Sequence, residues 1–246
     1  GHLSTPAFYK NSWVKENLKN QLQNEFDLEF NFSDEIEYSM FPVPHFNFKN
    51  VKLFSNDKEF ASIESFKIFL SFKKFFDKDK MNIQDIEIKN SKFIVYKQEV
   101  KDLINFFDKQ INKNKLIVKQ SKIFLKNKDD EIYLIININK IKSLFDDRVG
   151  LNKFNFDGEI FNNQINLVLT NNFFNNDLLF EIILKEIRGK FINELNYSKR
   201  INKGKLSFYH SNKTYNTKYE FDKETLQFNS EKRIGYLVSY GGEINF

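Results

Sequence analysis

Apolar and polar residues alternate along most of this chain. The clearest case is FDLEFNF at residues 26–32, in which every second residue is apolar. A period of two is typical of a strand with one buried face. Similar segments recur about every ten residues, separated by Asn, Asp, Ser and Gly, which is typical of an all-β domain. The pattern predicts a mainly β protein, built as a long antiparallel meander.

The individual strands and turns follow from the same alternation. We expect a hairpin turn at Ser55–Lys58 and further turns at Asn90-Ser91, Lys119–Ser121 and Asn127–Asp130, where polar residues interrupt the apolar pattern. The strands are then predicted over residues 26–32, 36–40, 46–53, 63–72, 83–88, 93–96, 116–118, 123–125, 132–141, 154–156, 164–169, 178–184, 189–195, 205–209, 215–221 and 236–246.

One stretch, FPVPHFNFKNVKLFS at residues 41–55, marks where the sheet begins. Pro42 and Pro44 have no N–H to donate, so the chain is expected to be extended and unpaired there. After them, Phe46 and Phe48 share one face of a strand, whereas Val51 and Leu53 follow with the opposite parity. One extra residue in a β-bulge would produce that change.

Two segments have helical rather than strand periodicity. Thr5-Pro6 offers an N-cap followed by proline at the first helical position, and the apolar residues after it predict a helix over 5–25. Apolar residues at helical spacing predict a second, short helix over 99–111. The predicted fold is therefore mainly β and α+β by element count. No change in composition marks a linker, so the 246 residues are expected to form a single domain, 1–246.

Composition excludes several classes of protein. The chain has no cysteine, which excludes a disulfide framework and a thiol nucleophile. The formal net charge is +5, but Lys is interleaved with Asp and Glu, so no nucleic-acid partner is expected. No apolar run approaches the roughly 18 residues of a membrane-spanning helix.

The sequence offers no candidate for catalysis. Its three histidines, His2, His45 and His210, have no neighbour at a metal-binding spacing, and the acidic clusters fall in expected turns. We expect no enzyme activity, no metal and no cofactor. A cleft that gathered His45 or His210 with two carboxylates would reverse that expectation.

Many strands carry Phe, Ile and Leu on one face, and few helices are predicted to cover them. Two arrangements remain open from periodicity alone. Either the sheet packs onto itself as a sandwich, or it curves around an apolar partner that is not protein.

Several segments resemble the N-terminal domain of the AsmA family. The similarity lies in FDLEFNF and FPVPHFNFKNVKLFS, in ASIESFKIFLSFKKFFD and NIQDIEIKNSKFIVY, and in LIININKIKS and NKFNFDGEIFNNQINLVLT. It covers most of residues 5–185 and consists of strand spacings rather than a catalytic signature. Ser91 stands where the family commonly has proline.

The resemblance implies a groove of β-taco type, formed by a curled sheet that conducts phospholipid between the inner and outer membranes of Gram-negative bacteria. It also implies a periplasmic location, an inner-membrane anchor upstream of residue 1, and outer-membrane or periplasmic proteins as partners. The expected groove-lining, lipid-binding residues are the one-face sets Phe30, Phe32, Phe46, Phe48, Phe66, Ile68, Leu70, Ile86 and Ile88.

A rival hypothesis gives the chain a structural role. It would be an assembly factor for outer-membrane proteins that docks partners by adding their strands to an open sheet edge. That hypothesis predicts a filled core and an uncovered edge, whereas lipid transfer predicts an apolar face left open.

Overall fold

A computed structural model of the chain describes residues 11–33, 36–71, 83–101, 103, 115–198, 200–230 and 240–245. Its contacts divide the chain into two compact units, Gly1–Leu144 and Phe145–Phe246, here called the first and the second unit. The single domain expected over 1–246 stays a prediction.

The first unit contains the long helix and the strands that pack against it. Its described elements are α1 (Asn11–Phe26), β1 (Glu29–Asn31), β2 (Ile36–Ser39), β3 (His45–Ser55), β4 (Lys58–Leu70), β5 (Ile83–Tyr96), a 3-10 turn at Lys97–Glu99, β6 (Lys115–Lys126) and β7 (Ile132–Asp146), whose last two residues belong to the second unit.

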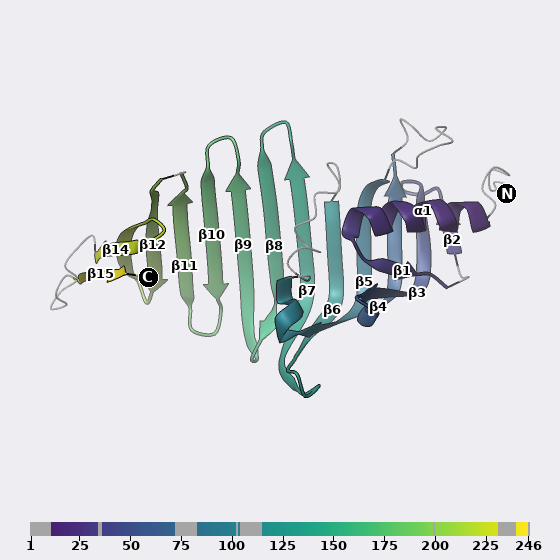
Figure 1. The fold of residues 1–246 in the computed structure, drawn as a ribbon, viewed down its shortest axis with the longest axis horizontal. Coiled ribbons are helices and arrows are strands. Elements are labelled where there is room, and N and C mark those ends of the chain that lie inside the picture. The colour runs from purple at the N-terminus through teal and green to yellow at the C-terminus, as the bar shows by residue number, and fades with distance from the viewer. Residues whose placement is uncertain are drawn as a thin grey trace. The chain divides into compact units, whose positions relative to one another are not determined.

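The second unit consists of strands joined by short turns. Its described elements are β8 (Leu151–Ile160), β9 (Asn163–Asn172), β10 (Asp177–Leu184), β11 (Gly189–Asn196), β12 (Asn202–His210), β13 (Lys213–Phe221), β14 (Thr225–Ser230) and β15 (Gly241–Asn245). Figure 1 shows β8–β11 side by side as consecutive antiparallel strands.

The predicted fold class is confirmed. The described strands form an open 15-stranded sheet in the order β1-β3-β4 and onward to β15, with β2 also paired to β3. The strands β5 and β6 run parallel, and the other strand pairs whose register is described are antiparallel. Of the described helices, none has the length and apolar character needed to cross a lipid bilayer.

Several predicted boundaries need correction. β5 and β6 are continuous strands, so Asn90-Ser91 and Lys119–Ser121 lie inside them and do not form turns. The strand predicted over 26–32 is only Glu29–Asn31 because α1 extends to Phe26. β14 was not predicted from the sequence. The turn at Ser55–Lys58 is confirmed, and Asn56 and Asp57 adopt the left-handed backbone that a tight hairpin requires.

Both predicted helices lie partly outside the described residues. Within the predicted range 5–25, the structure describes helix from Asn11 onward. For the helix predicted over 99–111, residues 100, 101 and 103 are helical and follow the 3-10 turn, and the remainder falls outside the described part of the chain.

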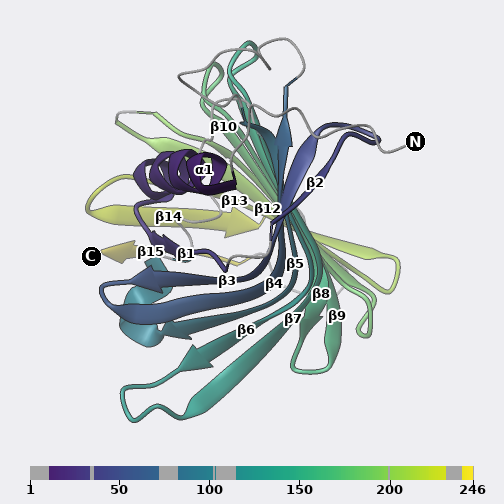
Figure 2. The same cartoon turned by 90° about the vertical axis from the view of Figure 1, so that its right-hand side faces the viewer.

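The core of the first unit lies between α1 and one face of the sheet. Leu18 and Leu22 on α1 are fully buried, and Figure 2 shows β3–β6 bending with the helix on their concave side. Phe26 at the end of α1 contacts Phe30, and Phe30 contacts Phe66 in the sheet, with ring centroids 5.9 and 5.8 Å apart. These aromatic contacts connect the helix to the sheet.

The sheet of the first unit is creased along one row of residues. Asn50, Asn90 and Gln120 all have a left-handed backbone, with φ of 50°, 54° and 50°. The buried positions change parity across the crease. In β3, Phe48 is buried and the next buried residue is Val51, and β4, β5 and β6 show the same change at the same row. Asn tolerates this conformation better than most residues, which explains its frequency here.

The parity change at Phe48/Val51 is therefore real, but its predicted cause is wrong. No extra residue is inserted there, because Lys49 pairs with Ser65 and Val51 with Ile63 in one unbroken register. β3 and β4 change parity together, which keeps their apolar residues on the same face. The register shift that does occur in β3 comes later, between Leu53 and Phe54.

Two buried serines complete the hydrogen bonding at this crease. The Ser91 N–H and the Ser91 hydroxyl both donate to Ser121 Oγ, at 3.0 and 2.6 Å, and Ser121 Oγ donates to the Lys119 carbonyl at 2.8 Å. Ser91 and Ser121 are 2% and 3% exposed. Ser121 thus supplies a partner to a backbone N–H in the interior, where an unpaired group is costly.

We expect Ser121→Ala to lower the free energy of unfolding by about 1–3 kcal/mol, because it leaves two buried donors of Ser91 without an acceptor. Ser91→Ala keeps the bond from its backbone N–H to Ser121 and should cost less. Denaturant unfolding of the two variants measures both values. An equal cost, or none for Ser121→Ala, would contradict this account.

Candidate functional site

All nine residues predicted to line a groove lie in the first unit, on the same side of its sheet. Phe30, Phe48, Ile68, Ile86 and Ile88 are fully buried, and the other four are at most 5% exposed. Phe32 contacts Phe48 and Phe66, with ring centroids 4.5 and 6.3 Å apart. These side chains are covered by α1 and by one another, so they form the core of the first unit. Lipid contact by them stays a prediction.

The histidines are also placed by the structure. His45 is 9% exposed, its Nδ1 lies 2.8 Å from the Val43 carbonyl oxygen, and its ring packs on Phe69. His210 lies at the end of β12 beside Ser211. In the described part of the chain, no three His, Asp or Glu side chains come together in a way that could hold a metal ion.

The second unit differs because its described residues form no buried apolar core. Among the residues that the structure describes, every apolar side chain counted as buried belongs to the first unit, the last being Ile141. In the second unit the apolar side chains are half-buried or exposed. Sequence reasoning placed the candidate surface in the first unit, but the structure leaves apolar side chains accessible in the second.

Strand register separates the second unit into an apolar and a polar face. Residues that pair directly across strands share a face, and alternate residues along a strand do so too. The residues on the apolar face, so defined, are Phe154, Phe156, Ile160, Ile165, Leu167, Leu169, Leu178, Phe180, Ile182, Leu184, Phe191, Leu195, Leu206, Phe208, Tyr215, Tyr219, Phe221, Leu226, Phe228 and Ile244.

One row of this face is apolar on six consecutive strands. We call it the apolar stripe, and its residues pair in the order Phe156, Leu167, Ile182, Phe191, Phe208 and Tyr215. Phe191 stacks on Phe208 with centroids 4.3 Å apart. Five strand spacings make the stripe about 24 Å long, and it runs across the strands rather than along them.

Two asparagines on the apolar face are bonded to tyrosines. The Tyr219 hydroxyl donates to Asn193 Oδ1 at 2.7 Å, and the Tyr197 hydroxyl donates to Asn171 Oδ1 at 3.0 Å. The Tyr219 ring also covers Gly204, where a Cβ atom would collide with it. These contacts give the asparagine side chains partners within the protein, so the face remains suited to an apolar ligand.

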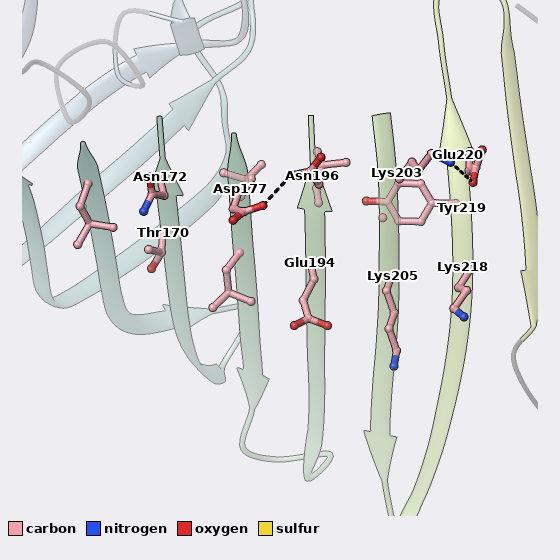
Figure 3. Close-up of a pocket in the computed structure, with 15 residues that line it drawn as sticks. Thr170, Asn172, Asp177, Glu194, Asn196, Lys203, Lys205, Lys218, Tyr219 and Glu220 are labelled. Carbon is pink, nitrogen blue, oxygen red and sulfur yellow. Dashed lines mark hydrogen bonds and ion pairs between the residues drawn. The ribbon is translucent and has the colours of Figure 1, made fainter. Parts of the chain in front are cut away.

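The polar face contains an open hollow of about 730 Å³ (Figure 3). Two side-chain pairs in it bridge neighbouring strands: Lys203 contacts Glu220 at 3.0 Å, and Asn196 donates to Asp177 at 2.8 Å. Such exposed cross-strand pairs contribute about 0.2–1 kcal/mol each to the stability of the sheet. The hollow is thus explained by a solvated, paired face.

Two ionisable groups in turns of the second unit have pKa values that are shifted by local hydrogen bonds. The backbone N–H groups of Glu224 and Thr225, each 2.8 Å from Asp222 Oδ1, hold the pKa of Asp222 below its ordinary value. The hydrogen-bonded carboxylate of Asp146 raises the pKa of Arg148. The hydrogen bonds that cause the two shifts stabilise turn conformations, and neither group lies on the apolar face.

The fold and this face define an open-sheet β protein with an apolar surface that is only half-buried in the described structure. Comparison with protein-family models and with curated proteins finds no match for the chain.

Proposed function

We propose that the protein is a non-catalytic lipid-binding and transfer module, and that the apolar face of the second unit takes up phospholipid acyl chains. One observation carries the proposal: a row of large apolar side chains crosses six strands, and no described apolar side chain of this unit is buried. Monomeric proteins seldom leave such a patch open unless it binds a partner or a lipid.

The size of the stripe suits an acyl chain. The hydrocarbon core of a bilayer is about 30 Å thick, so the chains of one leaflet extend about 15 Å, which is shorter than the stripe of about 24 Å. The stripe and the neighbouring row on each side of it together cover an area on the order of 300 Å². Covering it would contribute up to about 7 kcal/mol before the costs of association.

In this proposal the first unit supports binding without touching lipid. Phe66 and its neighbours fill a closed core under α1, which gives the sheet a rigid beginning. The resemblance to the AsmA family adds the setting that we propose: the periplasm, an inner-membrane anchor upstream of residue 1, and movement of phospholipid between the two membranes.

The rival function is docking of partner strands at a sheet edge. β15 favours it, because all five residues are exposed and β14 is the neighbour with which it pairs in the described part of the sheet. The rival also requires a filled core, however. The half-buried apolar face of the second unit supports lipid binding over strand addition.

Native mass spectrometry of the protein, extracted in the presence of lipids, tests the proposal. We expect phospholipid to co-purify with it, at one or a few molecules per chain. A protein that carries no lipid after this extraction, and that takes none from vesicles of purified phospholipid, would refute lipid binding. Capture of unfolded outer-membrane proteins by such a lipid-free protein would favour the rival.

A further inference from the structure

We infer that the bound lipid is an anionic phospholipid whose headgroup lies at one particular end of the second unit. The inference rests on the proposed function and adds the class of lipid and its orientation. Its basis is the distribution of charge at the two ends of the strands.

Three turns lie together at one end of β8–β13, here called the basic end: residues 161–162, 185–188 and 211–212. Because the strands are antiparallel, alternate turns share an end. The exposed cations here are Lys185, Arg188 and Lys213, and none of them forms an ion pair within the described part of the chain. The acidic residue in these turns is Glu186, whose two carboxylate oxygens accept the Gln164 N–H at 2.9 and 2.8 Å.

The basic end is next to the apolar stripe, and its Lys213 belongs to the same face. Lys213 and His210 pair with each other and lie two residues beyond Tyr215 and Phe208, about 7 Å along the strands. Gly189, which follows Arg188, pairs with His210. Arg188 and Lys213 are therefore separated by little more than two strand spacings, about 10 Å, which two long cationic side chains can bridge around a phosphate.

Apolar side chains continue the stripe into these turns. Ile187 folds over Gly189 near Phe208: a Cβ atom at Gly189 would lie 3.2 Å from Ile187 Cδ1 and 3.4 Å from the Phe208 ring. Ile187 remains 49% exposed and Phe161 is 72% exposed. Apolar side chains therefore continue from the stripe towards the cations, so acyl chains on the stripe could extend to a headgroup at this end.

The opposite end has a different charge balance. Its segments at 173–176, 197–201 and 222–224 contain Lys199, Arg200 and Lys223, which are balanced by Asp222, Glu224 and the adjacent Asp177. The basic end has three cations and one carboxylate, Glu186. Carboxylates repel a phosphate, so an anionic headgroup is favoured at the basic end. Zwitterionic and anionic phospholipids have the same kinds of acyl chain. The charge at the basic end would therefore distinguish them by the net charge of the headgroup.

Charge reversal tests this inference. The variant Arg188→Glu/Lys213→Glu changes the basic end, and the matched control Arg200→Glu/Lys223→Glu changes the same number of cations at the opposite end. Each protein is incubated with phosphatidylcholine vesicles or with phosphatidylglycerol vesicles, and extracted lipid is counted after the vesicles are sedimented. Circular dichroism verifies that each variant is folded.

We expect the unsubstituted protein to extract phosphatidylglycerol about tenfold better than phosphatidylcholine, because basic residues attract an anionic headgroup. The basic-end variant should lose this preference and the control should keep it. Equal extraction of both lipids, or equal losses in both variants, would overturn the inference while leaving the proposed function intact. Sedimentation of the protein with anionic vesicles without extraction of lipid would indicate surface adsorption and overturn it as well.

Orientation is tested separately. The chain has no cysteine, so a single introduced thiol labels one position only. A fluorophore on Ser211→Cys at the basic end should be quenched by phosphatidylglycerol with a nitroxide headgroup, and one on Glu224→Cys at the opposite end should not. Equal quenching at both positions would refute the orientation, and absence of bound lipid in the unlabelled protein would instead refute the proposed function.

Discussion

Replacing Ile182 with glutamate should reduce lipid extraction by more than about tenfold. Ile182 lies in the middle of the apolar stripe, paired with Leu167 and Phe191. The change removes an apolar side chain worth about 1.5–3 kcal/mol when buried and places a carboxylate where acyl chains would lie. Each 1.4 kcal/mol is a factor of ten in affinity. The sedimentation assay with phosphatidylglycerol vesicles measures the loss.

The matched control is the next residue. Ile183 is also half-buried, but its side chain lies on the polar face, where its cross-strand neighbours are Asn166 and Lys190. Ile183→Glu therefore introduces the same charge in the same strand without entering the apolar face, and extraction should stay near that of the unsubstituted protein. Equal losses in the two variants would show that binding does not distinguish the faces.

Much of the fold could be predicted from alternation alone. Strand positions in the second unit follow directly from it, because each strand has one apolar and one polar face and short turns separate them. β14 was missed because TLQFNS at 225–230 is short and carries few apolar residues. It becomes a strand through pairing with β13 and β15, which a local pattern does not contain.

The crease in the first unit could not be predicted for a related reason. Asn90 and Gln120 lie where polar residues predict turns, and both have the left-handed backbone that is common in turns. The strand nevertheless continues through each of them. A single strand with such a residue would be expected to turn. β5 and β6 adopt the same conformation in the same row and retain their pairing on both sides of it, and this is a property of the sheet.

The candidate site was harder to predict than the fold. Alternation correctly grouped Phe46, Phe48, Phe66 and Ile68 on one face, but a shared face does not specify what covers it. Coverage depends on α1 and β1, which reach the sheet through long-range contacts. A usable signal was present in the sequence: apolar alternation continues after residue 150, and no amphipathic helix is predicted there to cover it.

Replacing Phe66 with alanine should lower the free energy of unfolding of the first unit by about 3–5 kcal/mol, the usual cost of removing a buried aromatic ring. Phe66 is 1% exposed and contacts Phe30 and Phe32. The control is Phe161→Ala, because Phe161 is 72% exposed and its loss should cost less than about 0.5 kcal/mol. Denaturant unfolding measures both.

This comparison also separates the two possible locations of the lipid. If the apolar face of the second unit binds lipid, folded Phe66→Ala protein at low temperature should extract phosphatidylglycerol as the unsubstituted protein does, despite its lower stability. The opposite result, unchanged stability with lost extraction, would mean that Phe66 contacts lipid directly. The groove would then lie along the nine residues from Phe30 to Ile88, and α1 would have to leave the sheet to admit the ligand.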